Sequence, residues 1–385
     1  MPVTGTGGTD DATRMTTLDR YIFRGLLLNY LIALAVMISL YVVLDMLFNM
    51  DEFTETGGGM LILLTKLWSY YSARVFEYFS QLSGVISLFA CLLTVARMRR
   101  LNELTAVIAS GVSLYRVAVP VLAFGLITTG LWYIDTEIVI PHIAHKLARR
   151  HDDALGKRSY GVWFLADRDN ALLSAREYDP SERELKRLLV IRRHADGTLD
   201  SIIQADLANW QPTPGGSARG RWVLERGVER RRGTEDENAV SLGEDMPFED
   251  LRYYDSDLDP RSVELRQATG WVRYLSTARM LELRSQNLDI DTRRRIAQTR
   301  HARFTTPLIS LLMLCLGLPF VLDRMPGNVL ADGTKALLTC GACFLMAFVM
   351  QNRAPTDAAT SALPAWLTIL VFTPVAAVLM DRLRT

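Results

Sequence analysis

Apolar and polar positions divide the chain into three parts. Long apolar runs occupy both ends, and a region dense in Asp, Glu and Arg lies between them, from about residue 149 to residue 303. Several of the runs are long enough to cross a hydrocarbon core of about 30 Å. This pattern is typical of a membrane protein with an inserted soluble domain and does not fit a single soluble globular fold.

Six apolar runs predict six transmembrane helices, three before the polar region and three after it. The expected spans are Leu26–Phe48, Gln81–Met98, Val117–Ile138, Thr305–Leu322, Thr334–Gln351 and Ala362–Met380. The stretch Tyr70–Gln81 is apolar but carries Arg74 and Glu77, so it is either an interfacial helix or the outer end of the second span.

The distribution of charge around the spans predicts their orientation. Arg20 and Arg24 precede the first span, whereas three acidic residues follow it: Asp51, Glu52 and Glu55. Because cytoplasmic loops are enriched in Lys and Arg, we expect the N-terminus in the cytoplasm and the polar region outside the inner membrane. The C-terminal Arg382 and Arg384 then return to the cytoplasm.

The polar region changes from helical to strand-like periodicity. Short candidate strands read YGVWFLA (160–166), NALLSA (170–175), LKRLLVIRR (185–193), SIIQADLANW (201–210) and RWVLERG (221–227). Turn signals separate them, at Asp179-Pro180, Asp196-Gly197 and Pro214-Gly215-Gly216. Short strands at this spacing predict an antiparallel sandwich or barrel-like fold. Helical periodicity resumes over Ser262–Asn287, and Ile290–Arg303 is basic and polar.

Composition excludes several classes of function. The net charge of +1 gives no basic field for nucleic acid. No G-x-x-x-x-G-K-[ST] motif is present, so the chain is not expected to hydrolyse ATP itself. The four cysteines all lie in apolar runs, which excludes a disulfide framework in the polar region. Cys340 and Cys343 form a C-x-x-C, but their apolar setting favours small packing residues over a metal or redox pair.

A histidine-rich connector follows the third span. His142, His145, His151 and the Asp152-Asp153 pair cluster there, and His142 and His145 share a helix face at i, i+3. Metal binding is one interpretation, and a hydrated juxtamembrane connector is the other. We expect no metal and no cofactor.

A short amphipathic segment lies between the second and third spans. Asn102 is the expected N-cap of a helix over about 102–111, Glu103 lies in its first turn, and Gly111 is its expected stop. Leu104, Val107 and Ile108 fall on one face at i, i+3, i+4 spacing. The segment either turns the chain around or offers a docking surface outside the bilayer.

Asp45 lies near the outer end of the first span. Ionisable groups at membrane depth are costly unless they face a cavity or a partner, so such a residue is a functional candidate. The alternative is a hydrated position at the interface. Tyr41, Asp45 and Phe48 share one helical face by spacing.

Four places in the chain carry short motifs: LDRYI at 18–22, NELT at 102–105 with ASGVS at 109–113, GVWF at 161–164 and LGLPF at 316–320. Together they resemble the LptF/LptG permease family of the lipopolysaccharide-export transporter. LDRYI at 18–22 resembles that family's opening, and NELT at 102–105 with ASGVS at 109–113 resembles its cytoplasmic coupling segment. GVWF at 161–164 resembles the start of its external domain, and LGLPF at 316–320 resembles its fourth span.

The resemblance implies a fold with six transmembrane helices that flank a periplasmic β-jellyroll. Residues 1–17 are polar and rich in Gly and Thr, which predicts a disordered tail. Carried onto the rest of the chain, the resemblance implies spans one to three over 18–140 and a jellyroll over 141–270. A helical connector over 271–303 and spans four to six over 304–385 complete the chain.

The resemblance also implies partners and sites. Two such subunits pair, as a heterodimer or a homodimer, and a cytoplasmic ATPase dimer docks on the coupling helices. A single-span partner with its own jellyroll joins them, and lipopolysaccharide or a related glycolipid is the cargo. The docking residues would be Glu103, Leu104, Val107, Ile108 and Gly111. The lipid path would be lined by Tyr41, Asp45 and Phe48 of the first span and by Phe344 and Phe348 of the fifth.

Two alternatives to a transporter subunit stay open at this point. One is a membrane enzyme that acts on lipid through the histidine–aspartate cluster. The other is a non-transporting scaffold whose external domain binds envelope proteins.

Overall fold

The structure is a computed structural model of the chain. It describes residues 17–51, 60–149, 158–194, 196–212, 220–231, 248–266, 268, 270–284, 290–322, 328–353 and 362–381. Two compact units are present: one contains residues 1–43, 78–135 and 297–385, and the other contains residues 44–77 and 136–296. The expected disordered tail lies outside the described residues except for Thr17. His151, the Asp152-Asp153 pair, the Pro214 turn, Arg382 and Arg384 also lie outside them.

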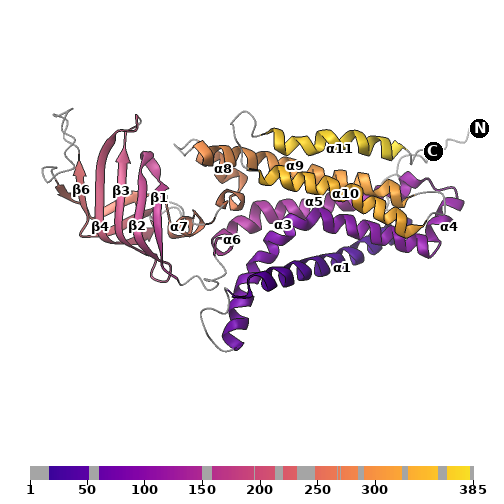
Figure 1. The fold of residues 1–385 in the computed structure, drawn as a ribbon, viewed down its shortest axis with the longest axis horizontal. Helices are drawn as coiled ribbons and strands as arrows, with labels where there is room; N and C mark the ends of the chain where they lie inside the picture. Colours follow the sequence, from indigo (N-terminus) through magenta and orange to yellow (C-terminus); the bar gives the residue numbers. More distant parts are fainter. Residues whose placement is uncertain are drawn as a thin grey trace, which may run out of the picture. The chain divides into compact units, whose positions relative to one another are not determined.

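Within the described residues, six helices are long and apolar enough to cross a membrane, which confirms the predicted number and their order along the chain, three before the sheet and three after it. They are α1 (Thr17–Phe48), α3 (Met60–Arg100), α5 (Leu114–Ile134), α9 (Ile290–Val321), α10 (Val329–Asn352) and α11 (Leu363–Asp381) (Figure 1). The third span continues through a π-helical turn, η1 (Asp135–Val139), into α6 (Ile140–Leu147).

Several helices extend past the predicted limits because their polar residues find partners. The stretch Tyr70–Gln81 is not a separate interfacial helix but part of the continuous α3. Arg74 pairs with Glu77 at 3.3 Å, and Glu77 accepts a hydrogen bond of 2.9 Å from the Tyr274 hydroxyl. Paired charges do not interrupt a helix, which explains why the hydropathy pattern underestimated its length. Likewise, the basic stretch from Ile290 is the first part of α9.

The helical unit is tightly packed around α9. An added Cβ at Gly317 would lie 2.7 Å from the Leu88 side chain of α3, and one at Gly84 would lie 2.7 Å from the Ser310 hydroxyl of α9. Small residues let helix backbones approach closely in a membrane, where packing drives association. Gly317 belongs to the LGLPF stretch, so this motif has a packing explanation.

The second unit contains an antiparallel sheet. Its described strands are β1 (Tyr160–Ala166), β2 (Leu172–Asp179), β3 (Glu184–Arg193), β4 (Leu199–Pro212), β5 (Gly220–Glu225), β6 (Val228–Arg231), β7 (Phe248–Asp250) and β8 (Tyr253–Ser256). The hydrogen-bonded order is β1-β2-β3-β4-β5-β8, and β6 joins β4 and β7. Figure 1 labels β1 to β4 and β6 of this sheet. Both β5 and β6 pair with the long β4, over different parts of its length.

The five predicted strands match β1 to β5, with shifted limits for all but β1. The three strands β6, β7 and β8 are too short to show an alternating pattern, and none was predicted. Among the described strands, β1 to β5 pair with their neighbours in sequence. A jellyroll in the strict sense therefore stays a prediction, whereas an inserted antiparallel β-domain is observed.

Alternating side chains along the strands build the core of this domain. On β5, Trp222 and Leu224 are buried, and on the neighbouring strands of the same sheet Val190 of β3 and Ile203 of β4 are fully buried. Helix α7 (Pro260–Arg266) contributes Val263 to the same cluster. A period of two is expected for a sheet with one buried face.

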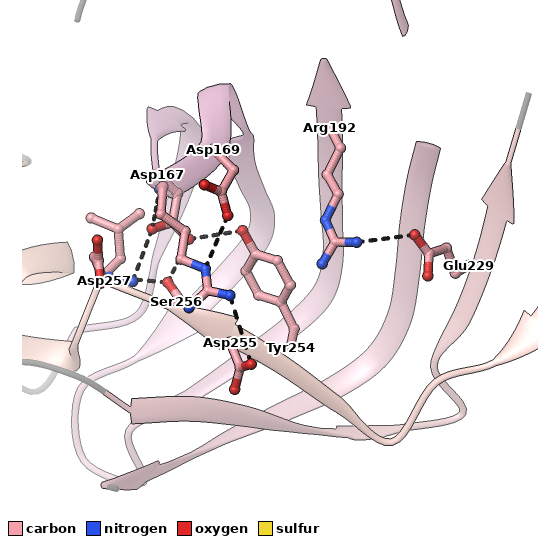
Figure 2. A network of polar contacts seen from close by, with 10 residues as sticks. Asp167, Asp169, Arg192, Glu229, Tyr254, Asp255, Ser256 and Asp257 are labelled. Atoms are coloured by element: carbon pink, nitrogen blue, oxygen red, sulfur yellow. Dashed lines mark hydrogen bonds and ion pairs between the residues drawn. The ribbon is translucent and has the colours of Figure 1, made fainter. Parts of the chain in front are cut away.

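Asp167 joins the two ends of the sheet. It follows β1, the first strand of the hydrogen-bonded order, yet its carboxylate accepts hydrogen bonds from Tyr254 and Ser256 of β8, the last strand (Figure 2). It also accepts from the backbone N–H groups of Arg168 and Asp257, at 2.8 and 3.0 Å. The sheet must therefore curve until its ends meet, which agrees with the predicted barrel-like character.

The helices after the sheet differ from the prediction. Ser262–Asn287 is not one helix: α7 ends at Arg266, and a 3₁₀ turn, η4 (Trp271–Tyr274), and α8 (Thr277–Arg284) follow. Gly270 has a φ of 86°, a left-handed conformation that ends helical periodicity. Residues 285–289 lie outside the described part of the chain.

The role of Asp167 gives a testable prediction. Asp167→Ala removes four hydrogen bonds to a buried carboxylate, so we expect the free energy of opening β1 and β8 to fall by about 3 kcal/mol. Hydrogen–deuterium exchange of the full chain in detergent measures this as faster exchange in both strands. Asp255→Ala is the matched control, because the Asp255 side chain is exposed on β8; equal exchange in the two variants would contradict the assigned role.

Candidate functional site

The candidate site is the short helix between the second and third spans. Helix α4 (Glu103–Ala109) is bracketed by two residues in the left-handed conformation, Asn102 with φ 59° and Gly111 with φ 86°. Gly111 is therefore the stop that the sequence predicted. Asn102 stands at the N-cap position, but its side chain makes no capping hydrogen bond. Its left-handed backbone turns the chain sharply after α3. Asn tolerates this conformation better than most residues.

The apolar face of α4 points into the protein. Leu104 is 2% exposed within the core of the helical unit, and Val107 and Ile108 pack partly buried against the same core. The predicted docking face is thus the face that anchors α4, since an amphipathic helix buries its apolar stripe against its own chain. The outward face presents three small residues instead: Thr105, Ala106 and Ala109.

Glu103 connects α4 to α1. The Tyr21 hydroxyl donates to the Glu103 carboxylate, with distances of 2.9 Å to each oxygen. The contact joins residues 82 positions apart in sequence. Sequence analysis identified both Tyr21 and Glu103 as motif residues but did not connect them.

A second polar contact joins α1 to α5. The Asp19 carboxylate pairs with the Arg116 guanidinium at 2.7 Å. Leu18 and Ile22, on either side in the LDRYI stretch, pack into the core of the helical unit. The residues of this opening stretch therefore have two roles. The apolar residues fix α1 in the core, and the polar residues contact Glu103 of α4 and Arg116 of α5.

A third contact joins the end of α3 to α10. Arg99, shortly before α4, pairs with Asp332 at 3.1 Å, and both side chains are largely buried. Buried Arg–carboxylate pairs are charge-assisted and geometrically specific. Both α1 and α10 are thus held by polar contacts at the α3–α4 junction.

The predicted lipid-path residues of α1 have different surroundings. Asp45 accepts a hydrogen bond of 2.9 Å from the Tyr71 hydroxyl of α3, and Tyr41 packs its ring 4.3 Å from that of Tyr78, also on α3. Phe48 is 84% exposed. The partner of Asp45 gives this carboxylate a structural role, in addition to the role predicted from its depth.

The predicted residues of α10 lie next to each other. Phe344 and Phe348 stack with ring centroids 6.3 Å apart. Phe348 is exposed on the outside of the described chain, whereas Phe344 packs partly against the core. Together they give α10 an aromatic ridge.

Metal-ligating side chains do not converge. In the described ranges, no group of three or more His, Cys, Asp or Glu side chains is arranged to hold a metal ion. His142 is exposed, and His151 with its aspartate pair lies outside these ranges. Cys340 and Cys343 are both buried, and the Cys340 thiol donates to the Met313 carbonyl at 3.3 Å. Their surroundings are those of packing residues.

Comparison with known proteins agrees with this architecture. The family described as "Lipopolysaccharide export system permease LptF/LptG" matches residues 20–382, nearly the whole chain. No curated protein matches the chain at a significant level. Permeases of this family are transporter components and not enzymes, and the six apolar helices agree with a multi-pass protein of the inner membrane. The chain therefore belongs to the LptF/LptG family of lipopolysaccharide export system permeases.

Proposed function

We propose that this chain extracts lipopolysaccharide or a related glycolipid from the inner membrane and passes it to a periplasmic bridge. A separate cytoplasmic ATPase dimer would supply the energy, because the chain has no phosphate-binding loop of its own. The other proposed partners are a sister permease subunit, identical or different, and a single-span protein with its own jellyroll.

The observation that carries this proposal is the set of polar contacts at the α3–α4 junction. Glu103 of α4 is held by Tyr21 of α1, and Arg99 at the end of α3 is held by Asp332 of α10. Helices α1 and α10 are the two helices that carry the proposed lipid-path residues. A partner that displaces α4 would therefore displace α1 and α10 together.

The proposed mechanism is a rigid-body transmission. ATP-driven closure of the ATPase dimer would move α4, and the buried Leu104 would carry its motion into the helical unit. Packed interfaces shift between discrete arrangements instead of deforming continuously, so a small displacement at α4 would be transmitted to the spans. The resulting shift of α1 and α10 would narrow the lipid path and force the glycolipid outward.

The sheet domain would receive the acyl chains. Exposing an acyl chain to water costs about 0.8 kcal/mol for each CH₂ group, so an exported lipid needs apolar cover along its way. We assign residues 141–270 to this periplasmic domain, residues 271–303 to the return connector, and residues 18–140 and 304–385 to the membrane part, with both termini in the cytoplasm.

The outward face of α4 is the surface that we expect the ATPase to cover. Single cysteines at Ala106 and Ala109 should react with a membrane-impermeant maleimide, and Leu104→Cys should react at least about tenfold more slowly, because Leu104 is buried. Adding the ATPase dimer should protect the first two positions. Labelling rates that are equal at all three positions would contradict the assigned faces.

Docking through this face is tested by substitution. Ala106→Arg should abolish copurification with the ATPase and ATP-dependent lipid release, because the large charged side chain prevents close contact. Ala331→Arg, an exposed alanine at the start of α10, is the control and should retain both. If Ala106→Arg retains both activities, docking through α4 is wrong; a complex that never contains an ATPase would favour the scaffold alternative.

The contacts of α1 should affect coupling more than docking. The double substitution Tyr21→Phe with Asp19→Asn removes the hydrogen bond from Tyr21 to Glu103 and the negative charge that pairs with Arg116. Since the loss of one such hydrogen bond alone costs about 1 kcal/mol, lipid released per ATP hydrolysed should fall at least about fivefold while ATPase binding is unchanged. Tyr133→Phe, at an exposed tyrosine of α5, is the matched control. Unchanged coupling in the double variant would exclude α1 as the transmitting helix.

A further inference from the structure

A cavity in the second unit lies beside the end of the third span. It has a volume of about 260 Å³. The lining residues come from three segments: the end of α6, the turn between β2 and β3, and the start of α7. They are His145, Arg149, Pro180, Arg183, Asp259, Pro260, Arg261 and Glu264. The third apolar span ends at Leu147, so Arg149 stands just beyond the expected hydrocarbon region.

Three arginines line this cavity, and none of them forms a direct ion pair among the described residues. Within the part of the chain that the structure describes, the guanidinium groups of Arg149, Arg183 and Arg261 make no hydrogen bond or ion pair to a protein side chain. The Nε atom of Arg149 is buried and has no hydrogen-bond partner. A buried donor without an acceptor is unfavourable by about 1–3 kcal/mol, and more for a charged group.

The two carboxylates that line the cavity, Asp259 and Glu264, make their hydrogen bonds to other groups and not to these arginines. Asp259 is engaged as the cap of α7, where its side chain accepts from the Ser262 N–H at 2.9 Å. Glu264 accepts from the Tyr178 hydroxyl at 3.4 Å. Burial raises the pKa of the Glu264 carboxyl above its ordinary value, although Arg149 and Arg183 act in the opposite direction. The arginines therefore outnumber the acids and lack direct contact with them.

We infer that this cavity binds a phosphate group. Arginine presents planar donors that suit the oxygens of phosphate, and three of them from separate segments surround one anion-sized space. The volume is below the range of about 300–1,000 Å³ typical of sites for whole drug-sized ligands, so the cavity accommodates a headgroup fragment and not a complete glycolipid. The choice of a phosphorylated glycolipid as the source of this phosphate rests on the proposed function.

The position of Arg149 directly after the third span relates this phosphate site to the proposed export of lipid. Along the chain, Arg149 lies between the end of the third span at Leu147 and the first strand of the sheet domain, β1. A phosphate held there would orient the headgroup while the acyl chains follow. Because the same contacts would hold free phosphate, both sources are included in the test.

The test compares two double variants of the full chain in nanodiscs. Arg183→Gln with Arg261→Gln removes two exposed charges of the cavity, and Arg187→Gln with Arg252→Gln removes two exposed charges elsewhere on the same domain. Isothermal titration uses three probes: lipid A with its phosphates, the same lipid after enzymatic dephosphorylation, and inorganic phosphate. Thermal unfolding of each variant verifies that the domain is folded.

We expect the cavity variant to bind phosphorylated lipid A about tenfold more weakly than the parent, and the control variant to bind it equally well. The dephosphorylated lipid should not distinguish them. If the variant loses affinity for inorganic phosphate alone, the phosphate site is supported with free phosphate as its ligand. If the cavity variant binds both phosphate-bearing probes within about twofold of the parent, the inference is wrong. No ATPase is present, so this failure leaves the proposed function untouched.

Discussion

A polar side chain inside an apolar helix bundle must find its partner within the protein, and this requirement determines which helices of the chain are joined. Polar groups that are buried without a partner are costly, and in lipid no water is present to replace one. The helical unit meets the requirement at several positions with pairs that connect different helices: Asn29 of α1 donates to Thr94 of α3 at 2.8 Å, and Ser87 of α3 donates to Thr128 of α5 at 2.9 Å. The buried Asp135 carboxylate is an exception, because it has no hydrogen-bond partner among the described residues. Of the pairs around α4, the one between Arg99 and Asp332 is largely buried and follows the same rule, whereas the contact between Tyr21 and Glu103 is exposed.

The same rule organises the sheet domain, where one carboxylate fixes the curvature. The strands supply backbone hydrogen bonds only to their neighbours, so the first and last strands of the order need another connection. Asp167 provides it through Tyr254 and Ser256, and the nearby Arg266 donates to the Ala166 carbonyl. Burial lowers the pKa of Arg266 to about 10, so this side chain stays charged at neutral pH and complements the aspartate.

Sequence reasoning identified what depends on local pattern and missed what depends on pairing at a distance. The number of spans, the class of the inserted domain and the stop at Gly111 all follow from periodicity or from one residue's conformational freedom. The inward orientation of Leu104 does not, because an apolar stripe looks the same whether it packs on its own chain or on a partner. The links from Tyr21 to Glu103 and from Arg99 to Asp332 join distant residues that carry no shared local signal, although each charged residue in an apolar context was a sign that a partner exists.

Helix α3 has 41 residues, and at about 1.5 Å per residue it is about 60 Å long. This contour length is about twice the thickness of the hydrocarbon layer. The helix therefore contains more residues than one crossing of the bilayer uses, and part of α3 lies outside the hydrocarbon layer.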